Sequence, residues 1–188
     1  MKFNRLVILT AFFFSSCATI HTGPLLVGDV PLNFGRCHEG EVYTDPEQRF
    51  QVVCPFPGAV KNIKNTGISF NNMDSVFDTV LVYDRSSDID AILKDYKLKL
   101  SGQRVTMDIK EDENMSYRGY SARNFNFLLK SKEGNIEGID VTRFVKTQDY
   151  VYWIHYSSLV AQEIRPHDLT EASIFFDSVK LKREFGQV

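Results

Sequence analysis

The sequence predicts an α+β fold in which a mainly antiparallel sheet is sandwiched by helices. Two segments carry apolar residues at helical spacing, the stretch between them alternates with a period of two, and turn-forming residues separate the runs. The chain has 188 residues, of which 43% are apolar and 24% are charged. These values allow one compact domain with a tail, and they exclude wholesale disorder.

The first elements of the expected domain are short strands. Four runs predict them: Val42–Thr44, Arg49–Cys54, Ile68–Phe70 and Val76–Tyr83. The Asp45-Pro46-Glu47 turn joins the first two runs into a hairpin, and Pro55 ends that hairpin because proline cannot donate to a strand ladder. The folded domain is therefore expected to cover residues 41–188.

A helix is predicted directly after these strands. Ser86-Ser87-Asp88 offers an N-cap, and Gly102 marks the end of the helical pattern. The apolar residues between these limits recur at helical spacing: Ile89, Ile92, Leu93, Tyr96 and Leu100. The spacing predicts a helix of about three turns with one buried face.

Residues 103–159 change to a period of two and predict a four-stranded antiparallel meander. Turns are expected at three places: Glu111–Asn114, Ser131–Asn135 and Thr147–Asp149. Residues 150–156 are apolar or aromatic on both strand parities, which is typical of a strand buried on two sides.

A second helix is expected to begin at Pro166, since proline is favoured at the first helical position. Its apolar stripe contains five residues: Leu169, Ala172, Phe175, Phe176 and Val179. Asp168, in the first turn, is expected to cap the helix and to interact favourably with its dipole.

This order of elements resembles the PsbP-like α/β/α sandwich family over residues 41–182. The resemblance depends on the strand Phe50-Gln51-Val52-Val53-Cys54 with its exit at Pro55, the mid-chain helix, the meander and the closing segment Phe175–Leu181. Members of that superfamily share a fold and differ in role: photosystem accessory subunits, a Ran-binding import factor and many bacterial lipoproteins. The resemblance implies a non-catalytic binding or assembly module, and it transfers no functional residue to this chain.

Residues 1–16 have the pattern of a secretory signal peptide. Two cations, Lys2 and Arg5, precede a short apolar run that is too brief to cross a bilayer. Phe14-Ser15-Ser16-Cys17 resembles the lipobox of bacterial lipoproteins, although Phe14 stands where leucine is usual. The resemblance implies that Cys17 becomes the acylated N-terminus, with palmitate among its acyl chains. The alternative is an ordinary signal peptide with an incidental cysteine.

Charge and sorting signals extend this interpretation. Cleavage before Cys17 removes two of 22 cations, so 20 remain against 24 acidic residues, a net charge of −4. This balance and the pI of 6.1 argue against a nucleic-acid partner. The membrane is therefore expected to hold the protein through its lipid. Ala18 differs from the aspartate that resembles an inner-membrane retention signal, which favours the outer membrane, facing the periplasm.

Residues 17–40 are expected to form the lipidated N-terminus and a tether, because glycine and proline recur there without a sustained period. Cys37 and Cys54 remain in the mature chain. In an oxidising compartment this pair favours a disulfide, which would close a loop of about 18 residues and contribute roughly 3 kcal/mol. The alternative is two unpaired thiols, one of them buried in a strand.

The four histidines are candidate metal ligands or catalytic bases. His38 lies beside Cys37 and Glu39, but no spacing typical of zinc sites follows, and a disulfide would consume both thiols. We therefore expect no metal site. The sequence has no glycine-rich phosphate loop, and we expect no cofactor. His155 shares a strand face with apolar residues, which favours a hydrogen-bonded core histidine.

The leading functional hypothesis is a lipid-anchored envelope protein with a non-catalytic domain that binds a protein or a small ligand in the periplasm. Tyr150, Tyr152 and Tyr156 lie on one strand parity and offer a possible binding surface, unless the last helix covers them. One alternative is a hydrolase-type enzyme that uses His155 with Ser157 or Ser158. Another is a structural accessory subunit of an envelope complex.

Overall fold

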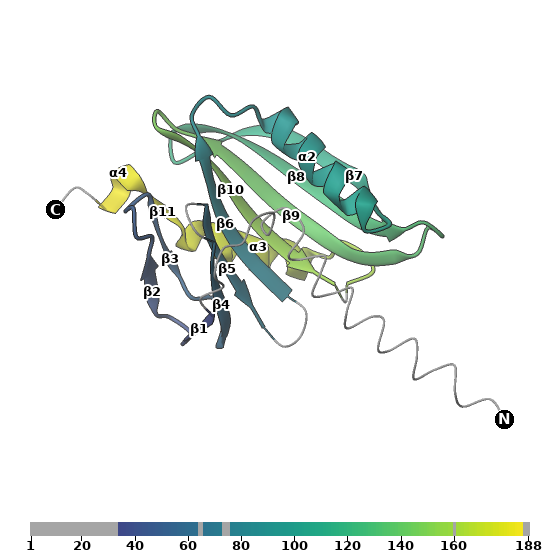
Figure 1. Ribbon diagram of the computed structural model, residues 1–188, viewed down its shortest axis with the longest axis horizontal. Helices are drawn as coiled ribbons and strands as arrows, with labels where there is room; N and C mark the ends of the chain where they lie inside the picture. The colour runs from purple at the N-terminus through teal and green to yellow at the C-terminus, as the bar shows by residue number, and fades with distance from the viewer. Residues whose placement is uncertain (1–33, 64–65, 73–75, 160, 186–188) are drawn as a thin grey trace.

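The computed structural model describes residues 34–63, 66–72, 76–159 and 161–185. Its main element is a sheet of eight antiparallel strands, which have the following bounds: β1 (Phe34–Cys37), β4 (Gly58–Ile63), β5 (Gly67–Asn71), β6 (Val76–Asp84), β7 (Val105–Tyr117), β8 (Tyr120–Ser131), β9 (Ile136–Lys146) and β10 (Tyr150–Ser158). The spatial order is β1-β4-β5-β6-β10-β9-β8-β7 (Figure 1). β10 therefore lies near the centre, between β6 and β9.

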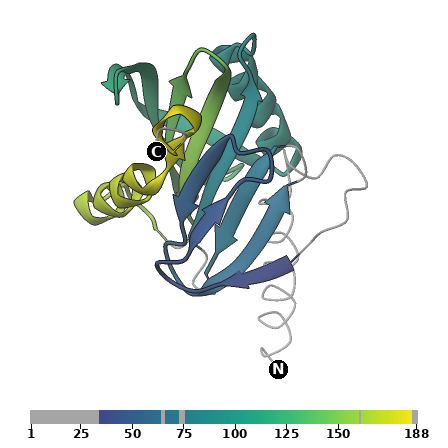
Figure 2. The same cartoon turned by 90° about the vertical axis from the view of Figure 1, so that its left-hand side faces the viewer.

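A second, smaller sheet contains β2 (Val42–Thr44), β3 (Phe50–Val53) and β11 (Lys180–Leu181). The helices are α2 (Ile89–Gly102), α3 (Pro166–Ser178) and α4 (Lys182–Phe185). α2 covers one face of the large sheet, over its β7–β8 side (Figure 1). α3 and the small sheet cover the other face (Figure 2). This arrangement confirms the predicted α+β class, a mainly antiparallel sheet between helices.

The two predicted helices are confirmed at their capping residues. Asp88 is the N-cap of α2, and its carboxylate accepts a hydrogen bond from the backbone N–H of Asp90 at 3.4 Å. α3 begins at Pro166, and Asp168 accepts a hydrogen bond from the backbone N–H of Arg165 at 3.0 Å. Leu169 departs from the prediction, because its side chain is exposed while the rest of the stripe is buried.

The four-stranded meander is confirmed as β7 to β10, but its first turn lies elsewhere. β7 continues through Glu111–Asn114, with a register irregularity after Ile109, and the chain reverses at Arg118 and Gly119. Both turn residues have positive φ, 51° and 80°, as the tightest hairpin turns require. The acidic run is a solvated stretch of an edge strand, where charge discourages pairing with other chains.

Two features of the N-terminal part differ from the sequence-based expectation. Phe34–Cys37 was assigned to the tether, yet it forms β1 and pairs with β4, so the sheet begins before residue 41. The segment Gly58–Ile63 was not predicted as a strand, because its alternation is short and follows two prolines. The β2–β3 hairpin is formed as expected, but it belongs to the small sheet.

Each face of the large sheet has its own hydrophobic core. The core under α2 includes Trp153, Phe144 and Tyr96. The core under α3 and the small sheet includes Tyr152 and Phe175. β10 contributes alternate residues to both cores, which is why both of its parities are apolar in the sequence.

Candidate functional site

The predicted lipidation site lies outside the described residues. This holds for Cys17, for the signal peptide of residues 1–16, and for the part of the tether before residue 34. Among the helices that the structure describes, none is long and apolar enough to span a bilayer.

Cys37 and Cys54 form a disulfide, with their Cα atoms 6.3 Å apart. Cys37 ends β1, and Cys54 follows β3 directly with 1% of its surface exposed. The bridge therefore joins an edge strand of the large sheet to the small sheet. Because both thiols are bonded, neither is available to a metal beside His38. In the described segments, no group of three His, Cys, Asp or Glu side chains is placed to hold a metal ion.

The tyrosines of β10 do not form an exposed binding surface, which corrects that interpretation. Tyr152 and Tyr156 are 1% and 2% exposed, and Tyr150 is half-buried. The last helix covers this parity with Phe175 and Phe176, as the alternative interpretation expected. The Tyr156 hydroxyl donates to Glu171 of α3 at 2.8 Å.

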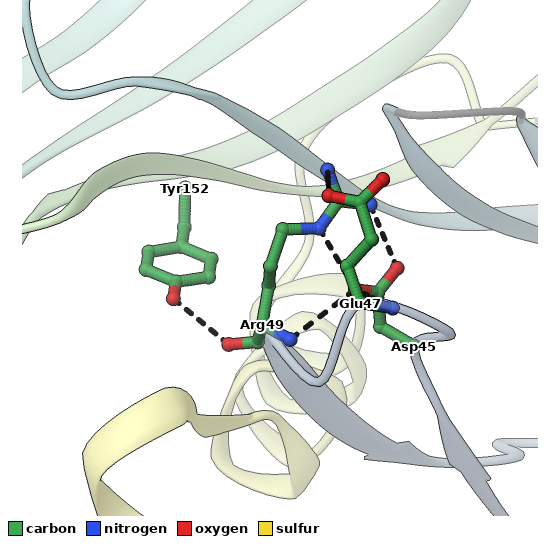
Figure 3. A network of polar contacts seen from close by, with 4 residues as sticks. All are labelled: Asp45, Glu47, Arg49 and Tyr152. Carbon is green, nitrogen blue, oxygen red and sulfur yellow. Dashed lines mark hydrogen bonds and ion pairs between the residues drawn. The ribbon is translucent and has the colours of Figure 1, made fainter.

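Tyr152 instead holds the small sheet against the large one. Its hydroxyl donates to the backbone carbonyl of Arg49 at 2.8 Å (Figure 3). The Arg49 guanidinium makes two hydrogen bonds of 2.7 Å to the carboxylate of Asp45. Both side chains of this ion pair are almost fully buried. Arg49 holds the pKa of Asp45 below its ordinary value, although burial alone would raise it.

The most chemically distinctive group of the α2 face contains Asp140, His155 and Tyr96. Asp140 on β9 is 0% exposed. His155 Nε2 lies 3.1 Å from Asp140 Oδ1, an ion-pair distance without the alignment of a straight hydrogen bond. The Tyr96 hydroxyl, from α2, donates to Asp140 Oδ2 at 2.7 Å. The helix and two strands therefore meet at one carboxylate.

Asp140 is held in its charged form by these neighbours. Burial alone would raise the pKa of Asp140, but His155 and the hydroxyl of Tyr96 help to outweigh it and keep the pKa below its ordinary value. Burial and the adjacent carboxylate raise the pKa of Tyr96 well above its ordinary value, so Tyr96 stays a hydrogen-bond donor.

The serines of β10 are not arranged as nucleophiles for His155. Ser157 lies opposite Asp140 in the strand register, and among the described residues its hydroxyl makes no hydrogen bond to the imidazole. Ser158 has the opposite parity and faces away from His155. A hydrolytic triad needs the base between the acid and the nucleophile, and these residues do not have that order.

A row of polar side chains extends from His155 across the sheet on the α2 face. The register places Thr79 opposite His155, Ser69 opposite Thr79, and Lys61 opposite Ser69. The hydroxyls of Ser69 and Thr79 are 2.9 Å apart. We call these four residues the polar row; sequence reasoning missed all of it except His155.

One signal for Asp140 was present in the sequence. The predicted turn at Thr147–Asp149 folds the two flanking strands onto each other, so residues equally far from the turn become neighbours. That symmetry places Asp140 close to His155 and opposite Ser157, as the register has it. No such short-range rule connects Lys61 to His155, because three strand pairings separate them.

Comparisons with known proteins identify the fold. No protein-family model matches the sequence, and neither does any curated protein. The solution structure of cyanobacterial PsbP (CyanoP) from Synechocystis sp. PCC 6803 is similar, with a TM-score of 0.59 and 12% identity over 83% of this chain and 95% of that one. A protein from Bacteroides thetaiotaomicron VPI-5482 has a TM-score of 0.51 and 13% identity over 79% of this chain, which spans 50% of its length. The chain has a PsbP-like α+β fold.

Proposed function

We propose that this chain is a lipid-anchored protein of the bacterial cell envelope. Its PsbP-like domain is a non-catalytic module that binds a partner or a ligand in the periplasm. Acylated Cys17 is the anchor, and the outer membrane is the membrane that Ala18 favours. The fold is compatible with an accessory role of this kind.

The disulfide between Cys37 and Cys54 is the observation that carries the proposal. Such bridges persist in oxidising compartments and are rare in the cytosol. It lies at the start of the described domain, downstream of a leader whose cation, apolar run and Ser-Ser-Cys pattern are typical of exported lipoproteins. The leader pattern and the disulfide are therefore two independent features that both support the periplasm as the compartment.

The geometry around His155 supports binding over hydrolysis. The imidazole is paired with Asp140, the Ser157 hydroxyl has no hydrogen-bond partner among the described residues, and Ser158 faces away, so neither serine of the rival mechanism is activated by the histidine. A buried histidine paired with a carboxylate is not arranged to transfer an acyl group.

Intact mass spectrometry of the full chain, purified from its own membranes, tests this proposal. We expect a mature chain that begins at Cys17 and is heavier by acyl groups, with two further hydrogens gained on reduction of the disulfide. Cys17→Ser should stop acylation, and the matched variant Cys37→Ser should remove only the reductant-dependent mass. An unmodified chain that still carries residues 1–16 would overturn the proposal.

A further inference from the structure

The Lys61 end of the polar row lies on the half of the α2 face that α2 does not cover, whereas His155 at its other end packs against Tyr96 of α2. α2 lies over the β7–β8 side of the sheet (Figure 1). The core beneath it includes Leu81 of β6 and Ile63 of β4. Beyond these residues the same face carries polar and charged side chains. Ser69 and Lys61 are half-buried, and Arg36 of β1, whose register partner is Ala59, is exposed on the same face.

The described part of the chain places no acidic side chain beside the two cations on this half of the face. Within the described residues, Lys61 and Arg36 form no ion pair, and the positions on this face of β1, β4, β5 and β6 carry no acidic side chain. Partial burial lowers the pKa of Lys61, because a desolvated ammonium group is less stable. A half-buried cation without a counter-charge is stabilised by binding an anion.

The far end of the row is polar, and its histidine already has an acidic partner. His155 has 11% of its side chain exposed and is backed by Asp140. Adjacent strands are about 4.8 Å apart, so the row from Lys61 to His155 spans roughly 14 Å. Ser69 and Thr79 fill the middle with two hydroxyls that bond to each other, which leaves one hydroxyl proton for an outside acceptor.

We propose that this face binds a small phosphate-bearing ligand, with its phosphate at Lys61 and Arg36 and its polar remainder at Ser69, the accessible hydroxyl of the row. The inference rests on the proposed function, since it supplies the ligand of that binding module. Phosphate suits the site because Lys61, Arg36 and the Ser69 hydroxyl lie on one face of three adjacent strands, and a phosphate offers several acceptor oxygens in different directions.

Calorimetric titration of inorganic phosphate into the detergent-solubilised full chain tests the site. Lys61→Met keeps a similar side-chain length and removes the charge. It should raise the dissociation constant for phosphate about tenfold, which corresponds to the loss of one charge-assisted hydrogen bond. Lys61→Arg keeps the charge and should bind within about threefold of wild type. Lys180→Met on the small sheet is the matched control and should change the constant less than about twofold, because salt screens distant surface charges.

The phosphate could belong to a lipid headgroup or to a soluble metabolite, and glycerol phosphate tests for the group that phospholipid headgroups share. Glycerol phosphate that binds more tightly than inorganic phosphate in a Lys61-dependent way supports a ligand with a glycerol phosphate group, as in a phospholipid headgroup, whereas equal or weaker binding supports a soluble phosphate without that group. No saturable binding of either probe, or equal binding by Lys61→Met, would overturn the inference. The mass of the Cys17 terminus is read separately, so failure here is distinguishable from failure of the proposed function.

Discussion

Two buried carboxylates lie on opposite faces of the large sheet, each beside β10. Asp140 is 0% exposed on the α2 face, and Asp78 is 3% exposed on the α3 face. Asp140 faces His155 and the hydroxyl of Tyr96. Asp78 stands opposite Tyr156, and its Oδ1 has no hydrogen-bond partner among the described residues.

The two environments shift the pKa values of the two carboxyl groups in opposite directions. Hydrogen bonds and the charge of His155 keep the pKa of Asp140 low in spite of burial. Burial raises the pKa of Asp78 well above its ordinary value, and the negative charge of Glu171 raises it further. The fold therefore favours the charged form of Asp140 and the neutral form of Asp78. Burial alone does not decide the charge of a carboxyl group; its partners do.

The largest expected contrast comes from replacing each aspartate by asparagine. Asp140→Asn leaves His155 facing a neutral amide and should lower the free energy of unfolding by about 3–5 kcal/mol, the usual cost of breaking a buried pair. Asp78→Asn replaces a neutral acid by a neutral amide of the same shape and should cost less than about 1 kcal/mol. Urea denaturation of the full chain measures both. Equal losses would show that the two carboxyls have the same charge state.

The next contrast compares the tyrosine beside each aspartate: Tyr96, which donates to Asp140, and Tyr156, which lies opposite Asp78 in the strand register. Tyr96→Phe removes a donor to a buried anion and should cost about 1.5–3 kcal/mol. Tyr156→Phe removes a bond to Glu171, whose side chain is 43% exposed, and should cost about 1 kcal/mol or less. The same denaturation assay compares them. A Tyr156→Phe loss as large as that of Tyr96→Phe would contradict the comparison.

The pH dependence should have opposite signs for the two groups. The folded pKa of Asp140 is lowered, so its contribution to stability is present above the unfolded pKa of about 3.9 and is lost as pH falls through the folded pKa. The folded pKa of Asp78 is raised, so ionisation of Asp78 destabilises the fold as pH rises above about 3.9, by up to about 1.4 kcal/mol per pH unit.

Urea denaturation between pH 2 and 8 measures these dependences. We expect Asp78→Asn to gain stability relative to wild type as pH rises above about 3.9, and Asp140→Asn to lose stability relative to wild type as pH rises from 2 toward about 4. Parallel pH profiles for the two variants would contradict the assignment of charge states.

The smallest expected effect is at His167, an exposed residue of α3 on the same face of the sheet as Asp78. His167 pairs with Glu171 at 3.0 Å, but its side chain is 68% exposed. His167→Ala should change the unfolding free energy by less than about 0.5 kcal/mol, because exposed ion pairs contribute little. His155→Ala is the buried counterpart and should cost several times more in the same assay.

Local signals made the helices and the meander predictable from the sequence. An N-cap at Asp88, a proline at 166 and apolar residues at helical spacing are short-range features, and the structure confirms them. The first meander turn was misplaced because Glu111–Asn114 is polar enough for a turn, whereas the real reversal at Arg118 and Gly119 carries only one glycine.

Long-range pairing could not be predicted in the same way. β1 has no alternating pattern of its own, and it becomes a strand because β4 lies beside it. The polar row also depends on pairings between strands far apart in the chain, so its members look unrelated in the sequence. Asp140 and His155 were within reach of prediction because a single hairpin relates them.

The disulfide also sets how the domain responds to a mechanical pull on its N-terminal end. A force applied ahead of β1 first loads the β1–β4 pairing and then meets the covalent bond at Cys37. From there it passes directly to Cys54 and bypasses residues 38–53, which include β2 and β3. The hairpin that Tyr152 holds in place is therefore outside the path of tension, and a reducing agent would bring it into that path.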